Sequence, residues 1–271
     1  MERETMDELA HQQRTHGGLR DLALFAGAGG GILGGKLLGW RTVCAVEINS
    51  FCARRLMQRQ NEGHLPPFPI WDDVCTFDGR PWRGIVDVVS GGFPCQDISC
   101  AGKGAGLEGT RSGLWFEMAR IISEVRPRFA FVENTANVIN RGLPRIASDF
   151  HAMGYNTRWG IFSACSVGAP HMRKRMFLVA HSRALGWDKI SRVQPKANYQ
   201  APRMWETCVK NDLRPFIGEC TDSSLSNGVR ISDVVADELD RIAAIGNGQV
   251  PAVVRLAWKM LTGDYDGKEP A

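Results

Sequence analysis

The residue with the clearest chemical use in this sequence is a thiol, Cys95, in the stretch Gly91-Gly92-Phe93-Pro94-Cys95-Gln96-Asp97-Ile98-Ser99. A β-forming run at residues 85–89 leads into a predicted break at Gly91-Gly92, so the thiol follows the carboxyl end of a predicted buried strand. Open α/β sheets carry their chemistry at that edge. Cysteine is by default a small buried hydrophobe, but the glycine, proline and polar neighbours here indicate an exposed, shaped loop. We therefore predict that Cys95 is a nucleophile.

A carboxylate and two arginines have similar positions at strand ends. Residues 128–132 form another predicted strand, which ends on Glu133. If this strand neighbours the one before Cys95, the thiol and the carboxylate share one edge of the sheet and form a catalytic constellation. Arg173 and Arg175 precede a further predicted strand and can favour a thiolate electrostatically. The simpler alternatives are a solvated strand-end carboxylate and surface or structural arginines.

The first part of the chain predicts a nucleotide-binding βαβ unit. Its elements are a strand at 19–25, a tight turn from Gly27 to Gly31, the start of a helix at 32–38, and a strand at 42–46 that ends on Glu47. Glycines let the backbone approach a ligand, and an acid at this position accepts hydrogen bonds from ribose hydroxyls. The spacing Gly29-x-Gly31-x-x-Gly34 also matches the dinucleotide fingerprint, which keeps a NAD-linked oxidoreductase as an alternative. That alternative leaves Pro94-Cys95, Glu133 and Asn247 unexplained.

The remaining elements alternate between helix and strand. We expect helices at 51–60, 114–125 and 143–153, and strands at 155–163 and 176–180. After a third strand, Asp73 precedes Val74 and can hold an adenine amino group, although such a pair is more often a turn. A glycine-rich loop at 102–109 has the length and composition of a mobile lid. This order predicts a Rossmann-like α/β fold with a mostly parallel sheet.

Composition narrows the class of protein. With 271 residues, 44% hydrophobic and 23% charged, the chain can bury a sizeable core. It has no run of about 18 apolar residues for a membrane span, and its first residues are charged where a secretory signal is apolar. Its eight cysteines include no Cys-x-x-Cys pair, which favours reduced thiols over a zinc site or disulfides. We therefore predict a cytoplasmic protein with no metal and no membrane partner.

Positive charge is concentrated in one part of the chain. Residues 171–216 hold ten Lys or Arg against three acids, whereas the net charge of the whole chain is only +4. Such a segment can face the phosphates of a nucleic acid. A solvated, weakly ordered surface is the equally simple alternative.

Taken together, these motifs resemble the DNA (cytosine-5)-methyltransferase family, in its compact phage or prophage form. They occur in the family's order: Phe25-x-Gly27-x-Gly29-Gly30, Glu47, Asp73, Pro94-Cys95-Gln96, Arg111-Ser112-Gly113-Leu114, Glu133-Asn134, Arg173-x-Arg175 and Gly246-Asn247. The sequence departs from the family at His171, where Gln is usual, and at Thr135, where Val is common. A larger departure is the region before Gly246, where the family keeps its target recognition domain, because only about 50 to 60 residues with little strand pattern lie there.

The resemblance implies a cofactor and a set of site residues. The cofactor is S-adenosylmethionine, and the residues implied to bind it are Phe25, Gly27, Gly29, Gly30, Glu47, Asp73, Val74, Pro94, Leu114 and Asn247. The implied catalytic residues are Cys95, Glu133, Arg173 and Arg175. Carbon 5 of cytosine is a poor nucleophile, so a thiolate first adds to carbon 6 and a carboxylic acid protonates ring nitrogen 3. The target base must leave the stack of double-stranded DNA.

The expected domain order is a flexible tail at 1–18, a catalytic and cofactor-binding domain at 19–180, a small basic target-recognition segment at 181–230, and C-terminal helices at 231–271 that return to the catalytic domain. We expect a monomer, and a partner restriction endonuclease is not visible in the sequence. A tRNA cytosine-5-methyltransferase of the same fold remains an alternative. A nucleic-acid-binding module without catalysis is disfavoured, because the thiol, the carboxylate and the arginines are all present.

Overall fold

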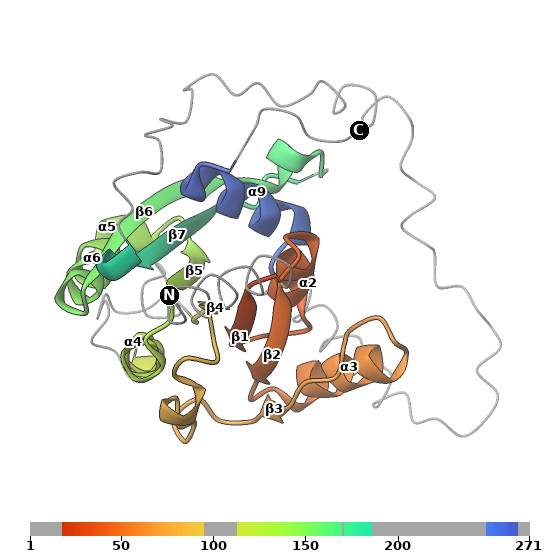
Figure 1. Cartoon of the computed structure of the whole chain (residues 1–271). Helices are drawn as coiled ribbons and strands as arrows, with labels where there is room; N and C mark the ends of the chain where they lie inside the picture. Colours follow the sequence, from red (N-terminus) through yellow and green to blue (C-terminus); the bar gives the residue numbers. More distant parts are fainter. Residues whose placement is uncertain (1–17, 95–112, 170, 186–247, 265–271) are drawn as a thin grey trace, which may run out of the picture.

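The computed structural model describes residues 18–94, 113–169, 171–185 and 248–264 of the chain (Figure 1). Four features singled out in the sequence lie outside these ranges. They are Cys95, the glycine-rich loop at 102–109, most of the basic segment at 181–230, and Asn247.

The described residues form a seven-stranded sheet in the order β3-β2-β1-β4-β5-β7-β6. The strands are β1 (Arg20–Leu24), β2 (Arg41–Val46), β3 (Ile70–Trp71), β4 (Val88–Gly92), β5 (Phe129–Thr135), β6 (Tyr155–Phe162) and β7 (Arg175–Ser182). The pairs among β1 to β5 are parallel, whereas β7 runs antiparallel to both β5 and β6. The predicted Rossmann-like, mostly parallel sheet is confirmed.

Helices cover both faces of this sheet. The α-helices are α2 (Gly30–Leu37), α3 (Ser50–Asn61), α4 (Gly113–Val125), α5 (Val138–Arg141), α6 (Leu143–Ala152) and α9 (Pro251–Thr262), and the short 3-10 turns are η1 (Arg80–Trp82), η3 (Ala164–Val167) and η4 (Arg183–Leu185). One core cluster packs α4, α5 and α6 against the sheet, with Trp115 and Phe150 fully buried. On the other face, α9 contacts α2, β6 and β7 (Figure 1).

Two strands differ from the sequence-based expectation at their ends. The glycines expected to break the chain after residue 89 belong to β4, where Gly91 pairs with Leu24 and Val132. A Cβ at Gly91 would lie 2.4 Å from the carbonyl oxygen of Leu24, so this close strand contact requires glycine. Strand β5 continues to Thr135, because β7 pairs with it up to that residue.

None of the helices in the described ranges is long and apolar enough to cross a membrane.

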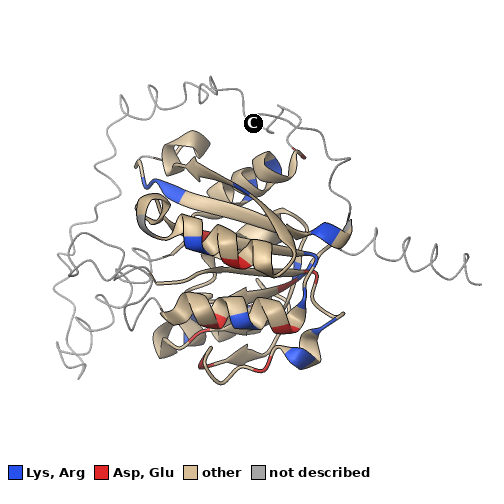
Figure 2. Ribbon diagram, turned by 90° about the vertical axis from the view of Figure 1, so that its left-hand side faces the viewer, with Lys and Arg blue, Asp and Glu red and all other residues tan. Residues whose placement is uncertain are grey.

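Two helices, α4 and α6, carry acidic and basic residues interspersed along their length (Figure 2). Ion pairs form within each of them, between Arg120 and Glu124 on α4 and between Arg145 and Asp149 on α6.

One acidic side chain, that of Asp21, is buried within the sheet. Asp21 on β1 is 1% exposed, and its Oδ2 accepts a long hydrogen bond of 3.5 Å from Thr42 while Oδ1 has no partner among the described residues. Burial raises the pKa of Asp21 from 3.8 to about 7, although hydrogen bonds from Ser90 and Thr42 oppose the shift. The folded protein therefore holds a proton on this group that the unfolded chain releases near pH 4.

This shift predicts a pH dependence of stability. The pKa of Asp21 is higher in the folded state than in the unfolded chain. The contribution of this group to the unfolding free energy is therefore complete below pH 4 and is lost as the pH rises through about 7. Asp21→Asn removes this dependence, so between pH 5 and pH 8 the wild type should lose about 2 kcal/mol of unfolding free energy relative to the variant. Urea denaturation at both pH values measures the difference, and parallel losses in the two proteins would contradict the assignment.

Candidate active site

A pocket of about 540 Å³ opens at the carboxyl ends of the parallel strands. This volume is in the range of sites for small molecules and cofactors. It brings together many of the residues selected from the sequence: Phe25, Gly27, Glu47, Asp73, Val74, Pro94, Leu114, Glu133 and Arg175. Strand ends and the first turn of α4 thus converge on one cleft.

The turn between β1 and α2 forms one wall of this pocket. Phe25 and Gly27 have positive φ angles of 51° and 55°, and Gly29 caps α2 with a φ of 94°. The non-glycine Phe25 in this conformation indicates a turn fixed by its surroundings. Gly29 and Gly30 do not line the pocket, and a Cβ on Gly30 would lie 2.2 Å from the carbonyl oxygen of Gln249. These two glycines therefore shape the turn, while Gly27 faces the cleft.

Glu47 stands where β2 ends, and two backbone groups fix its carboxylate. Oε2 accepts a hydrogen bond of 2.6 Å from the Gly27 N–H, and Oε1 accepts one of 2.7 Å from the Asn49 N–H. Each carboxylate oxygen has a second lone pair. The side chain is consequently held in one orientation at the pocket wall and can accept further hydrogen bonds from a pair of ligand hydroxyls.

Glu133 is a buried acid next to a cation. Its side chain lies 3.0 Å from the Nε of Arg175, measured to Oε1, and it also forms a hydrogen bond with Gln249. Burial raises the pKa of Glu133, while Arg175, Arg173 and the Gln249 hydrogen bond act in the opposite direction. A raised pKa favours the protonated form of a carboxyl group, which can donate its proton to a substrate.

The neighbouring Asn134 connects this acid to the segment that leads to Cys95. Its Nδ2 donates a hydrogen bond of 3.1 Å to the carbonyl oxygen of Phe93, and its Oδ1 accepts one of 2.7 Å from the Thr135 N–H. Asn134 is 2% exposed, so this contact is shielded from water. It fixes the backbone two residues before Cys95, which itself lies outside the described residues.

The two arginines differ in their contacts. Arg175 lines the pocket and pairs with Glu133, whereas Arg173, at a φ of 27°, donates from Nη2 to the carbonyl oxygen of Gly248. The structure therefore turns Arg173 toward the segment before α9.

Gln249 in that segment was not predicted from the sequence. The only sequence feature that could have indicated its role was its position two residues after Asn247.

Comparison with known proteins identifies the family. Residues 19–250 match the family model of the C-5 cytosine-specific DNA methylases, and the chain belongs to this family. Type II methyltransferase M.Eco47II of Escherichia coli is 37% identical over 164 residues, which are 59% of this chain and 38% of that protein. Type II methyltransferase M.NgoFVII of Neisseria gonorrhoeae is 27% identical over 237 residues, covering 83% and 60% of the two chains. The chain thus spans less than two thirds of either relative.

A solved structure supports the fold. The DNMT2 mutant of Spodoptera frugiperda superposes with a TM-score of 0.53 at 19% identity, over 68% of this chain and 57% of that one. At this identity the likeness concerns the fold alone. The family match disfavours the NAD-linked alternative, because that alternative rested on the glycine spacing of the first turn.

The packing of Gly92 against Glu133 predicts a sensitive position. A Cβ at Gly92 would lie 2.4 Å from Oε2 of Glu133, a carboxylate that is buried and paired and has little freedom to move. Gly92→Ala should therefore lower the unfolding free energy by about 1–3 kcal/mol through overpacking. Gly113→Ala is the matched control, because no atom of the described residues lies within 4 Å of the position that its methyl group would occupy at the start of α4. Equal stabilities of the two variants in urea denaturation would show that Glu133 is not confined.

Proposed function

We propose that this chain is a DNA (cytosine-5)-methyltransferase that transfers a methyl group from S-adenosylmethionine to carbon 5 of cytosine in double-stranded DNA. The observation that carries the proposal is the shared cleft, in which a pocket of cofactor size ends at the buried acid Glu133. Membership of the C-5 cytosine-specific methylase family gives this arrangement its reaction class.

The pocket residues fit S-adenosylmethionine in kind. Glu47 offers carboxylate oxygens for the ribose hydroxyls, and Asp73 offers one for the adenine amino group. Val74 and Leu114 add apolar surface for the base. When bound, S-adenosylmethionine supplies an electrophilic methyl group on a sulfonium. Asn247 lies outside the described residues, and its assignment to this pocket rests on the family's motif.

The chain's own groups would activate the cytosine. The Cys95 thiolate adds to carbon 6, which forms a C–S bond and moves ring electrons toward carbon 5 and nitrogen 3. Glu133 donates its proton to nitrogen 3 as charge accumulates there. Arg175, already paired with Glu133, is close enough to that acid to hold the ring oxygen next to nitrogen 3.

The cycle closes without a metal-dependent step. After carbon 5 takes the methyl group, with S-adenosylhomocysteine as the leaving group, a base removes the proton from that carbon, and the C–S bond breaks to return the Cys95 thiolate. Glu133 recovers its proton from nitrogen 3 in the same elimination. Because carbon 6 lies within the stack of a duplex, the cytosine must first be flipped out, at a cost of a few kcal/mol.

We assign DNA contact to the basic residues at 181–230, most of which lie outside the described ranges. The sequence there supplies Lys189, Arg192 and Lys196 for phosphates, and too few residues for an extensive reading of bases. A recognition sequence of about two to four base pairs is consistent with so short a segment.

The nucleophile can be tested by trapping. On duplex DNA that carries 5-fluorocytosine, the carbon 5 substituent cannot leave as a proton, so the covalent adduct should persist on the wild type. Cys95→Ser should form none, as judged by a shifted protein–DNA band on a denaturing gel. Equal trapping of the variant would reject Cys95. Methylation of tRNA in place of duplex DNA under the same conditions would favour the tRNA alternative.

The cofactor assignment can be tested at Glu47. Loss of charge-assisted hydrogen bonds in Glu47→Ala should cost on the order of 1.5 to 3 kcal/mol of affinity for S-adenosylmethionine. Glu62→Ala is the control, because Glu62 pairs with Arg59 on the exposed end of α3. Calorimetry measures both. A wild type that binds NAD and ignores S-adenosylmethionine would reject the methyltransferase proposal.

A further inference from the structure

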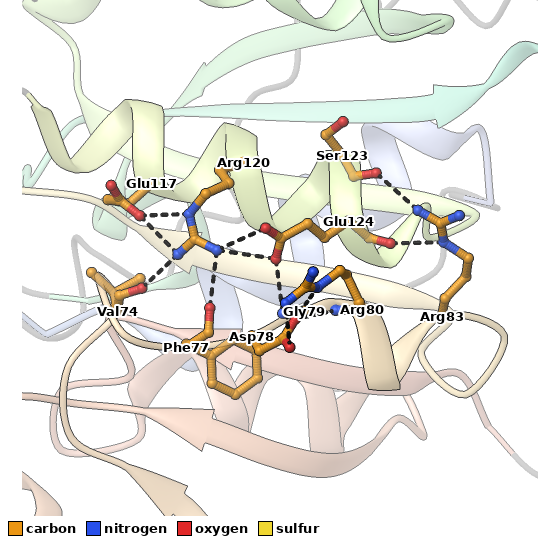
Figure 3. Close-up of polar contacts among 10 residues, drawn as sticks. All are labelled: Val74, Phe77, Asp78, Gly79, Arg80, Arg83, Glu117, Arg120, Ser123 and Glu124. Atoms are coloured by element: carbon orange, nitrogen blue, oxygen red, sulfur yellow. Dashed lines mark hydrogen bonds and ion pairs between the residues drawn. The ribbon is translucent and has the colours of Figure 1, made fainter.

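Arg120, in the middle of α4, joins this helix to a wall of the cofactor pocket. Its Nη2 donates to the carbonyl oxygen of Val74 and its Nη1 to that of Phe77, each over 3.0 Å (Figure 3). Neither the catalytic assignment nor the cofactor assignment uses this residue. An arginine at this position in an amphipathic helix would be expected to face solvent, yet it is only 34% exposed.

Two carboxylates of the same helix orient the guanidinium. Glu117, one turn earlier, accepts from Nε over 2.8 Å, and Glu124, one turn later, accepts from Nη1 over 3.0 Å. Glu124 also accepts a hydrogen bond of 2.8 Å from the Gly79 N–H. The two carboxylates hold the guanidinium of Arg120 in one orientation. Its remaining N–H groups donate to backbone carbonyls of the connection between β3 and η1.

That connection is held by the burial of Val74 and Phe77 and by hydrogen bonds to side chains of α4. It contains Asp73, Val74 and Cys75, which line the pocket, and beyond the two-residue strand β3 it makes turns instead of a ladder. Hydrogen bonds of the turn itself are local, such as those from the Cys75 N–H to Asp73 and from Trp71 to Thr76. Arg120 is sequence-distant, and its bonds fix the connection to a helix of the core.

The same helix also supplies a residue of the pocket lining. Leu114 lies in the first turn of α4 and lines the cleft with Asp73 and Val74. Because α4 is anchored by fully buried residues, among them Trp115 and Met118, it is a rigid reference for both positions. The hydrogen bond from Arg120 to Val74 therefore connects two segments that both line the pocket.

We propose that Arg120 is a positioning residue for the cofactor pocket, which keeps the segment Asp73–Val74 in its binding conformation without touching the ligand. This inference rests on the proposed function for the identity of the ligand. Without the arginine, the segment must be ordered when the ligand binds, and that ordering is subtracted from the affinity.

The sequence offers a matched control in Arg83. It also joins the chain around η1 to α4, through Nε to the carbonyl oxygen of Glu124 over 2.8 Å and Nη2 to that of Ser123 over 3.5 Å (Figure 3). These contacts are with the last turn of the helix and do not include the segment that lines the pocket. Arg83→Ala therefore removes a similar bridge at a site that does not support Asp73 or Val74.

The test is calorimetric binding of S-adenosylhomocysteine to the full chain. Arg120→Ala should weaken binding about tenfold, which corresponds to the ordering of one residue's backbone. Arg120→Lys keeps the charge but not the fork and should lie in between, while Arg83→Ala should stay within about twofold of the wild type. In steady-state assays, the KM for S-adenosylmethionine should rise in Arg120→Ala, and kcat at saturating cofactor and the KM for DNA should not change.

Three outcomes would overturn the inference. They are wild-type affinity in Arg120→Ala, equal losses in Arg120→Ala and Arg83→Ala, and a fall in kcat that saturating cofactor does not restore. Thermal denaturation checks that each variant folds. If Arg120→Ala does not fold, the affinity of Arg120→Lys for S-adenosylhomocysteine is judged by the same criteria. A wild type that binds no S-adenosylhomocysteine would reject the proposed function along with this inference, whereas wild-type affinity in the variants alone would reject only the role of Arg120.

Discussion

The site depends on the ion pair between the buried Glu133 and the partly buried Arg175, which forms because β7 runs against β5. The antiparallel pairing places the first residue of β7, Arg175, opposite Thr135 and within reach of Glu133. A parallel strand would bring its other end to this edge of the sheet. Removing Arg175 would take away a cation that opposes the burial-driven rise in the pKa of Glu133. The reversal of one strand and the chemistry of the acid are therefore linked.

The same edge of the sheet also organises the pocket. Glu47 directly follows β2, and Glu133 lies near the end of β5. The side chain of Asn134 on β5 donates a hydrogen bond to the carbonyl oxygen of Phe93, which follows β4. Hydrogen-bonded strands hold these groups at fixed separations, whereas the turns that line the pocket receive hydrogen bonds from other parts of the chain, as at Val74 from Arg120 and between Glu47 and the Gly27 N–H. The sheet thus carries the acid, and the connections carry the residues proposed to contact the ligand.

The sequence predicted the local features of this arrangement better than the long-range ones. The strands before Glu47 and around Glu133 could be predicted from the spacing of hydrophobic residues and from the turn residues that follow them. Both are local signals in the sequence. The antiparallel direction of β7 and the hydrogen bond between Gln249 and Glu133 depend on residues far apart in the chain. Gly91 and Gly92 were misread as a break because a glycine required by close strand packing has the same sequence signal as a turn. Arg120 has the pattern of a solvated helix position, and only the fold shows what it contacts.

The central claim is that one cleft activates carbon 5 of cytosine to take a methyl group. The most direct measurement uses duplex DNA and S-adenosylmethionine with a trideuterated methyl group, followed by digestion to nucleosides and mass spectrometry. The account predicts a label on 5-methylcytosine alone, with loss of the carbon 5 proton. A label on the exocyclic nitrogen of cytosine or on adenine would contradict it, because methylation of an amine needs neither a thiolate nor the buried acid Glu133.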